Sequence, residues 1–282
     1  MNFDQIDAFI AAGLKEDIGT GDVTCLACIP ASARNRARLL VKDEGVLAGV
    51  TIAERIFKTL DPTAHFEKIL DDGTNIKYGD VAFIVECHSQ ALLQGERLTL
   101  NTMQRMSGIA TISKQYHDAV ADLPVKILDT RKTTPLIRFL EKWAVRIGGC
   151  HNYRDGLYDW FMIKDNHTDA CGSIQAAIER VDAYQQEKGL NLNVTVEVRN
   201  LEELQQVLDT GKVTRIMLDN FQLETMREAV KIVGNRFETE ASGGVTLDTL
   251  RAIALTGVDY ISVGALTHSA QSLDLSLKVL KD

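Results

Sequence analysis

The chain has 282 residues, of which 45% are hydrophobic and 25% charged, with a formal net charge of −8 and a pI near 5.3. A chain of this length forms one large domain or two modest ones. The acidic balance argues against general nucleic-acid binding, and the lack of a long apolar run argues against a membrane span. Five cysteines without framework spacing predict reduced thiols and a cytoplasmic protein.

The first third of the chain predicts an α+β unit. Residues 4–16 repeat apolar side chains at helical spacing, and their acids argue against a signal peptide. Further helices are expected over 51–60 and 92–120, and strands over 36–42, 45–48, 65–70 and 81–87. In the long helix, Ser107 and Gly108 mark either a bend or a point of close packing.

Two short motifs near the start of the chain are weak signals. Cys25 and Cys28 form an isolated C-x-x-C in a segment that we interpret as a loop ending at Pro30. No second pair follows to complete a zinc site. A redox motif would lie at the start of a helix beside a strand, and this segment does not have that pattern. The turn at Gly19 and Gly21 is equally weak as a phosphate loop, because no helix with the expected signature follows.

After residue 124 the pattern changes to a strand followed by a helix, repeated. This alternation is typical of a parallel α/β sheet or barrel. Strands are expected over 125–129, 161–165, 194–198, 215–219, 237–241 and 260–264. Helices are expected over 134–147, 173–188, 201–208, 222–233 and 247–255. Six strands fall short of the eight that close a full barrel.

Polar residues or glycines follow each of these predicted strands. Because ligands bind outside the carboxyl ends of strands in parallel α/β folds, we expect these residues to share one rim. They are Arg131, Lys132, Lys164, Glu197, Asp219, Ser242, Gly243, Gly244, Gly264, Ala265 and Leu266. Some have a structural explanation on their own, since Glu197 could pair with Arg199 and Asp219 could cap the next helix. Such explanations do not account for the whole set.

The stretch over residues 129–167 is basic within an acidic chain. Between residues 131 and 166 it holds seven Lys or Arg and four acids, which gives seven minus four, or +3. Three of these cations recur at helical spacing, as on a solvated helix face: Arg138, Lys142 and Arg146. Arg131, Lys132 and Lys164 instead lie at the ends of strand-like runs, which favours an anionic ligand.

The chemistry of this rim suits a phosphorylated sugar and an acidic co-substrate. Arginine and lysine donate to phosphate and carboxylate, and glycine turns bring backbone N–H groups onto a phosphate. Glu197 and Asp219 can hold Mg²⁺ or ribose hydroxyls. A Schiff base on Lys132 or Lys164, as in aldolase barrels, would leave the carboxylates and arginines without a role.

Eight segments that span nearly the whole chain carry a family resemblance. They read EDIGTGDVT, GERLTLNTMQRMSGIAT, DTRKTTPLIRFLEKWAVRIGG, IKDNH, VEVRNLEEL, IMLDN, EASGGV and ISVGALTHS. In these segments the chain closely resembles quinolinate phosphoribosyltransferase, the decarboxylating nicotinate-nucleotide pyrophosphorylase of NAD synthesis. The resemblance implies an α/β fold with an N-terminal α/β sandwich domain over 1–108, joined by a C-terminal helix over 270–282. The remaining residues, 109–269, would form an incomplete, seven-stranded parallel α/β barrel.

The resemblance also implies partners and residue roles. The substrates would be quinolinate and phosphoribosyl pyrophosphate, with Mg²⁺ as the cofactor. The protein would form a homodimer, and whether dimers assemble further into hexamers stays open. Ligands for the carboxylates and phosphates would be Arg131, Lys132, Arg154 and Lys164, with Arg97 supplied across the dimer. Residues 242–244 and 264–266 would hold the 5′-phosphate, and Glu197 and Asp219 the ribose hydroxyls and the metal. Catalysis would rest on Lys132, Lys164, Glu197 and Asp219.

The chain departs from the family pattern just before Arg154. The family usually reads G-G-G-x-N-H-R, whereas residues 148–154 read GGCHNYR. Tyr153 therefore stands where a histidine would neighbour the substrate, and His151 lies two residues away. The hydrogen bonds around the substrate and the pH profile of the reaction therefore stay open. Two other functions also stay open, namely transfer to nicotinate or another aromatic acid, and anion binding without catalysis.

Overall fold

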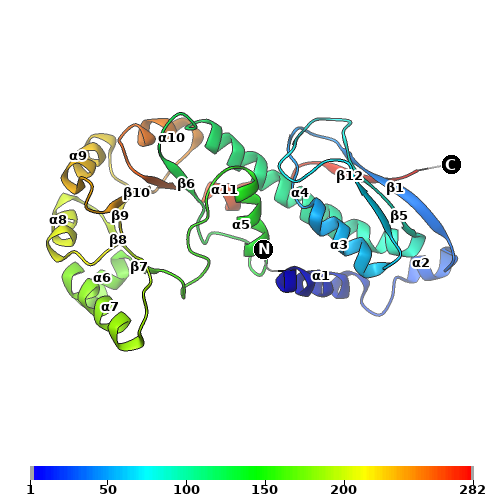
Figure 1. The fold of residues 1–282 in the computed structure, drawn as a ribbon, viewed down its shortest axis with the longest axis horizontal. Coiled ribbons are helices and arrows are strands. Elements are labelled where there is room, and N and C mark those ends of the chain that lie inside the picture. The colour runs from blue at the N-terminus through cyan, green and yellow to red at the C-terminus, as the bar shows by residue number, and fades with distance from the viewer. Residues whose placement is uncertain (1–2, 281–282) are drawn as a thin grey trace. The chain divides into compact units, whose positions relative to one another are not determined.

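The computed structural model describes residues 3–280 and divides the chain into two compact units. The first unit comprises residues 1–114, 134–149 and 270–282, and the second comprises residues 115–133 and 150–269. Each unit has its own sheet and its own helices (Figure 1). The segment 134–149 thus leaves the second unit and returns to it within the basic stretch 129–167.

The first unit is built on a four-stranded antiparallel sheet with the order β12-β1-β5-β3. Its strands are β1 (Arg34–Val41), β3 (His65–Lys68), β5 (Val81–His88) and β12 (Leu275–Val279), with β2 (Gly45–Val46) and β4 (Asn75–Ile76) as a separate pair. Its helices are α1 (Phe3–Ile18), α2 (Val23–Cys28), α3 (Val50–Leu60), most of α4 (Ser89–Asp118) and α5 (Arg138–Ile147). The α+β order predicted for the first third of the chain is confirmed.

The core of the first unit lies where α3 and α4 meet the sheet. Phe57 of α3 and Phe83 of β5 are fully buried, with ring centroids 6.3 Å apart. Met103 of α4 belongs to the same core, as predicted. Gly108 is a point of close packing, since a Cβ there would come within 1.8 Å of the Gln271 carbonyl oxygen. Any side chain at this position would therefore push the two segments apart.

The predicted C-terminal helix over 270–282 is wrong where the structure describes it. Residues 275–279 form β12, which pairs antiparallel with β1 and places Leu277 opposite Leu39. Leu275 and Leu277 are buried while Ser276 between them is less so, and this period of two is that of a strand. The last two residues of the expected helix, 281 and 282, lie outside the described residues.

Cys25 and Cys28 lie on the short helix α2 and not in a loop as predicted. The Asp22 carboxylate caps this helix by accepting a hydrogen bond from the Cys25 backbone N–H at 2.9 Å. Cys25 is buried, and burial raises the pKa of its thiol to about 11. Cys28 is exposed. A helix of six residues is too short for hydrophobic periodicity to reveal it.

The second unit is built on a six-stranded parallel sheet with the order β6-β11-β10-β9-β8-β7. Its strands are β6 (Lys126–Leu128), β7 (Phe161–Ile163), β8 (Val194–Val198), β9 (Arg215–Asp219), β10 (Glu238–Ser242) and β11 (Tyr260–Ser262). Its helices are α6 (Asp165–Cys171), α7 (Ile174–Lys188), α8 (Leu201–Thr210), α9 (Leu223–Val233), α10 (Leu247–Ala254) and α11 (Ala265–His268). The six predicted strands are confirmed.

A further segment extends this sheet beyond β6. Leu128 and His151 form a parallel bridge, and the backbone of His151 bonds to Ile127 and Asp129 at 2.8 and 3.0 Å. The described residues thus form six parallel strands and one further bridge, where the family resemblance implied seven strands. Helices α7 to α10 lie along the outside of the sheet (Figure 1), where α7 contacts β7 and α8 contacts β8. The carboxyl ends of the strands consequently share one rim.

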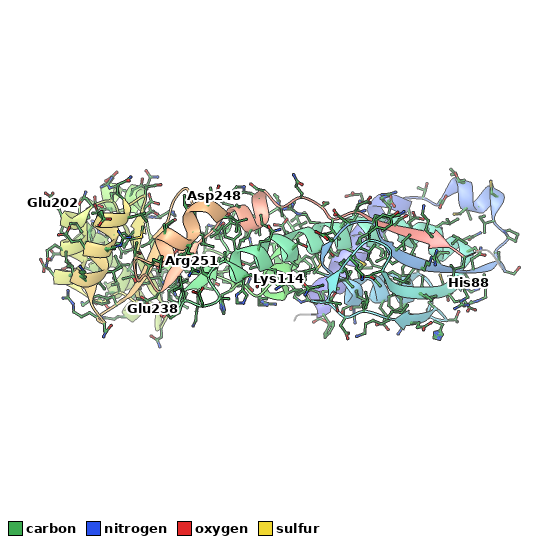
Figure 2. All side chains as sticks on the ribbon, turned by 90° about the horizontal axis from the view of Figure 1, so that it is seen from above. His88, Lys114, Glu202, Glu238, Asp248 and Arg251 are labelled. Carbon is green, nitrogen blue, oxygen red and sulfur yellow. The ribbon has the colours of Figure 1, made fainter. Side chains whose placement is uncertain are left out.

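Asp61 is a buried carboxylate in the first unit, directly after α3. It accepts hydrogen bonds from the Thr63 backbone N–H at 2.9 Å, the Thr63 hydroxyl at 2.6 Å and the His88 backbone N–H at 2.8 Å. Its side chain is 3% exposed, and the ring of His88 (labelled in Figure 2) also contacts it. Burial raises the pKa of Asp61, but these hydrogen bonds outweigh burial and hold the pKa well below its usual range.

We expect Asp61→Asn to lower the free energy of unfolding at neutral pH. We also expect it to reduce the loss of that free energy as the pH falls. An acid with a depressed pKa stabilises the fold above its unfolded-state pKa of about 4, and this stabilisation is lost as pH falls below that value. Losing the charged acceptor should cost about 1.5–3 kcal/mol at pH 7. Urea unfolding between pH 2 and 8 measures both effects. Asp7→Asn is the control, since Asp7 makes an exposed ion pair with Arg55. Equal acid sensitivity of Asp61→Asn and wild type would contradict this account.

Candidate functional site

The predicted rim residues lie at the carboxyl ends of neighbouring strands in the second unit. Glu197 of β8 is in register with Met217 of β9, and Asp219 of β9 is opposite Ser242 of β10. Lys164 directly follows β7, and Gly264 lies two residues beyond β11. The rim therefore brings together cations, carboxylates and glycine turns that are up to 135 residues apart in the chain, as between Lys132 and Thr267.

Lys164 and Glu197 form an ion pair across β7 and β8. The Lys164 Nζ lies 2.9 Å from Glu197 Oε2, and the Glu197 side chain is only 10% exposed. Arg199, the alternative partner considered for Glu197, instead pairs with Glu203 at 2.6 Å. Glu197 is consequently aimed at the rim with one cation beside it.

Asp219 and the turn after β10 are joined through Asn220. The Asn220 Nδ2 donates to Asp219 Oδ2 at 2.8 Å, and the Asn220 backbone N–H donates to the Ser242 carbonyl at 2.9 Å. Asp219 does not cap the next helix, whose N-cap is Gln222. Gly243 has a φ of +99°, and a Cβ on it would come within 2.2 Å of the Asn220 side chain. Only glycine leaves room for this contact.

Lys132 lies against the second glycine turn. The Thr267 hydroxyl donates to the Lys132 carbonyl at 2.7 Å, and the Lys132 backbone N–H donates to the Thr130 hydroxyl at 3.0 Å. A Cβ on Gly264 would come within 3.0 Å of Lys132 Cδ. Lys132 is exposed, whereas Leu266 is buried, so the 264–266 turn offers backbone and not side-chain groups.

Arg131 follows β6 at this rim, and its charge acts on Arg154, which also lines the cavity at the amino ends of the strands. The Nε of Arg131 is buried and has no hydrogen-bond partner among the described residues. Burial and the charge of Arg131 lower the pKa of Arg154. A buried donor without an acceptor costs about 1–3 kcal/mol, and two close like charges repel each other. An anion bound between them would relieve both penalties.

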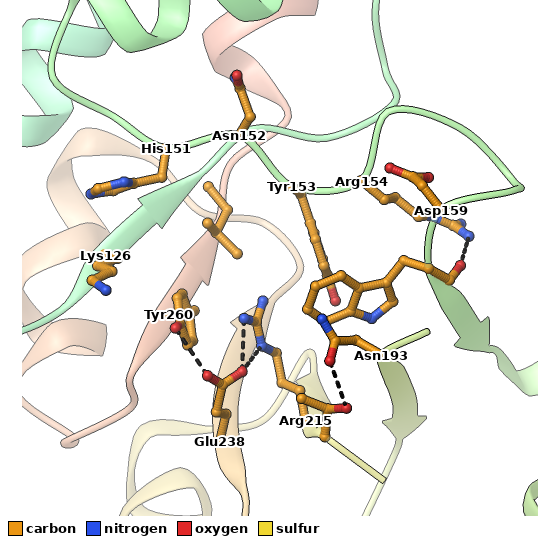
Figure 3. A pocket seen from close by; sticks show the side chains of 13 residues that line it. Lys126, His151, Asn152, Tyr153, Arg154, Asp159, Asn193, Arg215, Glu238 and Tyr260 are labelled. Atoms are coloured by element: carbon orange, nitrogen blue, oxygen red, sulfur yellow. Dashed lines mark hydrogen bonds and ion pairs between the residues drawn. The ribbon is translucent and has the colours of Figure 1, made fainter. Parts of the chain in front are cut away.

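Tyr153 does not point to the rim. Figure 3 shows its ring pointing into a cavity at the amino ends of the strands, and its hydroxyl lies 2.7 Å from Thr195 Oγ1. His151 is exposed and lines the same cavity, so it does not replace the family histidine at the rim. Residues at alternate positions of a strand face opposite ways, and sequence alone did not reveal which way this segment faces.

Asp129, which no sequence motif singled out, connects the two arginine segments. Asp129 is fully buried at the end of β6, two residues before Arg131. Its carboxylate accepts from Asn152 Nδ2 at 2.5 Å and from the Tyr153 backbone N–H at 2.8 Å. The available signal was a carboxylate directly after an apolar run, since a buried charge needs partners of this kind.

The structure also locates four other cations that the sequence singled out. Lys142 is 2% exposed, so its assignment to a solvated helix face is wrong, because α5 buries the face that carries it. Arg146 is exposed, as predicted, and Arg138 is partly buried. Arg97 is exposed on α4 in the first unit, and so does not belong to the rim geometry of the second unit.

Comparison with known proteins decides the family. The model for the quinolinate phosphoribosyl transferase C-terminal domain matches residues 109–278, and that for the N-terminal domain matches residues 22–107. The chain belongs to the quinolinate phosphoribosyltransferase family. It is 45% identical over 290 residues to the chloroplastic nicotinate-nucleotide pyrophosphorylase [carboxylating] of Arabidopsis thaliana, covering 98% of this chain and 83% of that protein.

Bacterial relatives of the quinolinate phosphoribosyltransferase family match along nearly their full length. The probable nicotinate-nucleotide pyrophosphorylase of Bacillus subtilis is 43% identical over 281 residues, covering 99% of this chain and 95% of that protein. The crystal structure of NadC from Streptococcus pyogenes superposes with a TM-score of 0.93 at 37% identity, covering 100% of this chain and 99% of that chain. The two-unit fold is therefore that of the family.

The described residues offer a limited set of metal ligands. Within residues 3–280 there is no group of three or more His, Cys, Asp or Glu side chains that could hold a metal ion. Mg²⁺ commonly uses one or two carboxylates together with substrate phosphates, so Glu197 and Asp219 fit a magnesium ion that arrives with a pyrophosphate. In the same part of the chain, no helix is long and apolar enough to cross a membrane.

Proposed function

We propose that this chain transfers the phosphoribosyl group from phosphoribosyl pyrophosphate to quinolinate with loss of CO₂. The products are nicotinate mononucleotide, pyrophosphate and CO₂, which makes the chain a pentosyltransferase of NAD biosynthesis. The observation that supports this proposal is the buried, unpartnered Nε of Arg131, whose charge acts on Arg154, at a rim that also bears glycine turns. Such a site is built for a dianion next to a phosphorylated sugar.

The rim residues divide into three groups by chemistry. Arg131, Arg154 and Arg97 bind the two carboxylates of quinolinate, with Arg97 coming from the partner subunit. Lys132 and Lys164 bind the pyrophosphate. The 5′-phosphate is bound by backbone N–H groups of the turns at residues 242–244 and 264–266. Helix-start and glycine-turn amides are suited to this, because their N–H groups point outward and carry partial positive charge.

Catalysis then rests on positioning and electrostatics. As pyrophosphate leaves, positive charge builds on ribose C1, and the ring nitrogen of quinolinate attacks that carbon. Glu197 and Asp219 accept from the ribose hydroxyls and hold the sugar in line, and the lysines stabilise the charge on the leaving group. Once the ring nitrogen is quaternary, it accepts the electron pair of the adjacent carbon–carboxylate bond, and CO₂ departs.

Mg²⁺ is the cofactor that we propose for this site. Glu197 and Asp219 would hold it together with oxygens of the pyrophosphate. Of the two, Asp219 is the less engaged in charge pairing, because Glu197 already contacts Lys164 at 2.9 Å while Asp219 accepts from the neutral Asn220 amide. When bound, the ion would neutralise charge on the departing pyrophosphate.

A direct assay tests the reaction and separates it from the alternatives. The protein is incubated with quinolinate, phosphoribosyl pyrophosphate and Mg²⁺, and nicotinate mononucleotide and CO₂ are measured. We expect both products in equal amounts. With nicotinate as the acceptor we expect no product, because a ring with one carboxylate leaves one cation site unfilled. Product from nicotinate would favour the related transferase, and quinolinate binding without turnover would favour a non-catalytic relative.

We further propose a cytoplasmic homodimer in which each site takes Arg97 from the partner subunit. The exposed position of Arg97 on α4 is compatible with such a contact. Mixing Arg97→Ala with Lys132→Ala subunits should restore about one quarter of wild-type activity, since random pairing makes about half of the dimers mixed, and in a mixed dimer both defects fall in one active site while the other site is intact. Each variant alone should be nearly inactive. The mixture is compared with the same proteins assayed separately, and no gain on mixing would contradict the shared site.

A further inference from the structure

A cavity of about 430 Å³ opens at the amino ends of the parallel strands, opposite the rim. Figure 3 shows Arg215, Glu238 and Tyr260 meeting on its floor. The Glu238 carboxylate accepts from Arg215 at 2.9 Å and from the Tyr260 hydroxyl at 3.1 Å, and the guanidinium lies 3.6 Å from the Tyr260 ring centroid. These three floor groups are therefore hydrogen-bonded or paired with one another.

Two residues that line this cavity, Tyr153 and Trp160, meet at the hydroxyl of Thr195 behind them, and the three are named here the Thr195 cluster. Thr195 is fully buried on β8. Its Oγ1 lies 2.7 Å from the Tyr153 hydroxyl and accepts from Trp160 Nε1 at 2.9 Å. The two aromatic rings meet edge to face, with centroids 5.4 Å apart at 81°. Two aromatic residues from outside β8 are thereby anchored on that strand.

The hydrogen bonds of the Thr195 cluster continue to a buried carboxylate. An indole nitrogen only donates, so Thr195 accepts from Trp160. Between the Thr195 and Tyr153 hydroxyls either oxygen can donate, and the Tyr153 hydroxyl is also hydrogen-bonded to the buried Glu240 carboxylate. The Tyr153 hydroxyl therefore links Thr195 to Glu240, a role that phenylalanine cannot fill.

The Thr195 cluster holds both ends of the loop that carries Arg154. Tyr153 directly precedes Arg154, and Trp160 directly precedes β7, which leads to Lys164. Arg154 Nη1 donates to the Trp160 carbonyl at 3.4 Å. Within the loop, the Asp159 carboxylate accepts from the backbone N–H groups of residues 155 and 156 at 2.7 and 3.0 Å. The loop is thus fixed at both ends and braced inside.

We propose that Tyr153 and Trp160 are positioning residues that set the affinity for the aromatic dicarboxylate by holding Arg154 beside Arg131. This inference rests on the proposed function. Arg154 and Arg131 repel each other, so a loosened loop would let them move apart and lose the paired arrangement that suits a dianion. Tyr153, the residue that departs from the family pattern, then acts through Arg154 and not by touching the substrate.

Single-atom changes in the Thr195 cluster test the proposal. Tyr153→Phe and Thr195→Val each break the hydrogen-bond chain, and each should raise KM for quinolinate on the order of tenfold. KM for phosphoribosyl pyrophosphate and kcat at saturation should change by less than about twofold, since the phosphate turns are untouched. Thr195→Ser keeps the hydroxyl and should restore the quinolinate KM. The matched control is Tyr116→Phe, which removes the hydroxyl of another buried tyrosine of the same unit.

The outcomes separate this proposal from the function on which it rests. If Tyr153→Phe lowers Tm as Tyr116→Phe does but leaves the quinolinate KM unchanged, the Thr195 cluster is structural only and the proposal is wrong. If the wild-type chain forms no nicotinate mononucleotide, the proposed function is wrong. In that case titration calorimetry with quinolinate still compares the dicarboxylate Kd of wild type and Tyr153→Phe, and equal values would overturn the positioning role.

Discussion

Arg131→Ala is expected to lower kcat/KM for quinolinate by about 10²–10⁴-fold. Each charge-assisted hydrogen bond contributes about 1.5–3 kcal/mol, and an arginine gives two of them to a carboxylate. The buried Nε of Arg131 lacks an acceptor, so the side chain is already desolvated and positioned before the substrate binds. Such preorganisation avoids the cost of ordering a flexible cation at the moment of binding.

Two variants sharpen this expectation. Arg131→Lys keeps the charge but loses the planar fork, so its activity should lie between those of wild type and Arg131→Ala. Arg146→Ala removes an exposed cation from α5 in the same basic stretch and should leave kcat/KM nearly unchanged. Steady-state assays at varied quinolinate concentration measure all three. Equal losses for Arg131→Ala and Arg146→Ala would show that net charge, and not a specific contact, explains the basic stretch.

Arg215→Ala is expected to destabilise the protein by about 3–5 kcal/mol, the usual cost of removing one partner from a buried ion pair. Arg215 is 4% exposed at the start of β9, where its guanidinium lies 2.9 Å from Glu238 and 3.3 Å from Glu240. Glu240 is fully buried. Without Arg215, its carboxylate would keep the Ser262 hydroxyl and Tyr153 but lose the cation with which it forms an ion pair.

The destabilisation by Arg215→Ala should grow as pH rises. Burial raises the pKa of Glu240, and Arg215 opposes that shift, so removing Arg215 raises the pKa further. A folded acid with a raised pKa holds its proton when the unfolded chain has lost it, so stability falls as pH increases above about 4. Urea unfolding at pH 5 and pH 8 should therefore show a larger loss at pH 8.

Two further variants serve as checks on the Arg215 prediction. Adding Glu240→Gln to Arg215→Ala removes the unpaired charge and should recover part of the stability and most of the pH dependence. Arg251→Ala breaks an exposed pair with Asp122 (Arg251 is labelled in Figure 2), and should cost less than about 1 kcal/mol. A similar loss for Arg215→Ala and Arg251→Ala would contradict the account of a buried pair.

The sequence alone determined the class of fold, the order of elements and the identity of most rim residues. Hydrophobic periodicity is local information, so the six parallel strands and the long helix through Met103 could be predicted from neighbours in the chain. The rule that ligands bind at the carboxyl ends of parallel strands then placed Lys164, Glu197 and Asp219 together without coordinates. The polar residues and glycines that follow each strand can be identified from the sequence itself.

Only the tertiary structure decided which way side chains face and what they pair with. Residues 275–279 form a strand because β1 offers a free edge, a long-range contact that no local pattern contains. Long-range contacts also explain why Lys142 is buried and why Asp129 joins the segment after β6 to the segment that carries Tyr153. Tyr153 faces the barrel interior because Thr195 and Glu240, from strands 42 residues or more further along the chain, supply its hydrogen-bond partners. Contacts between distant segments depend on the folded arrangement, so local sequence patterns could not predict them.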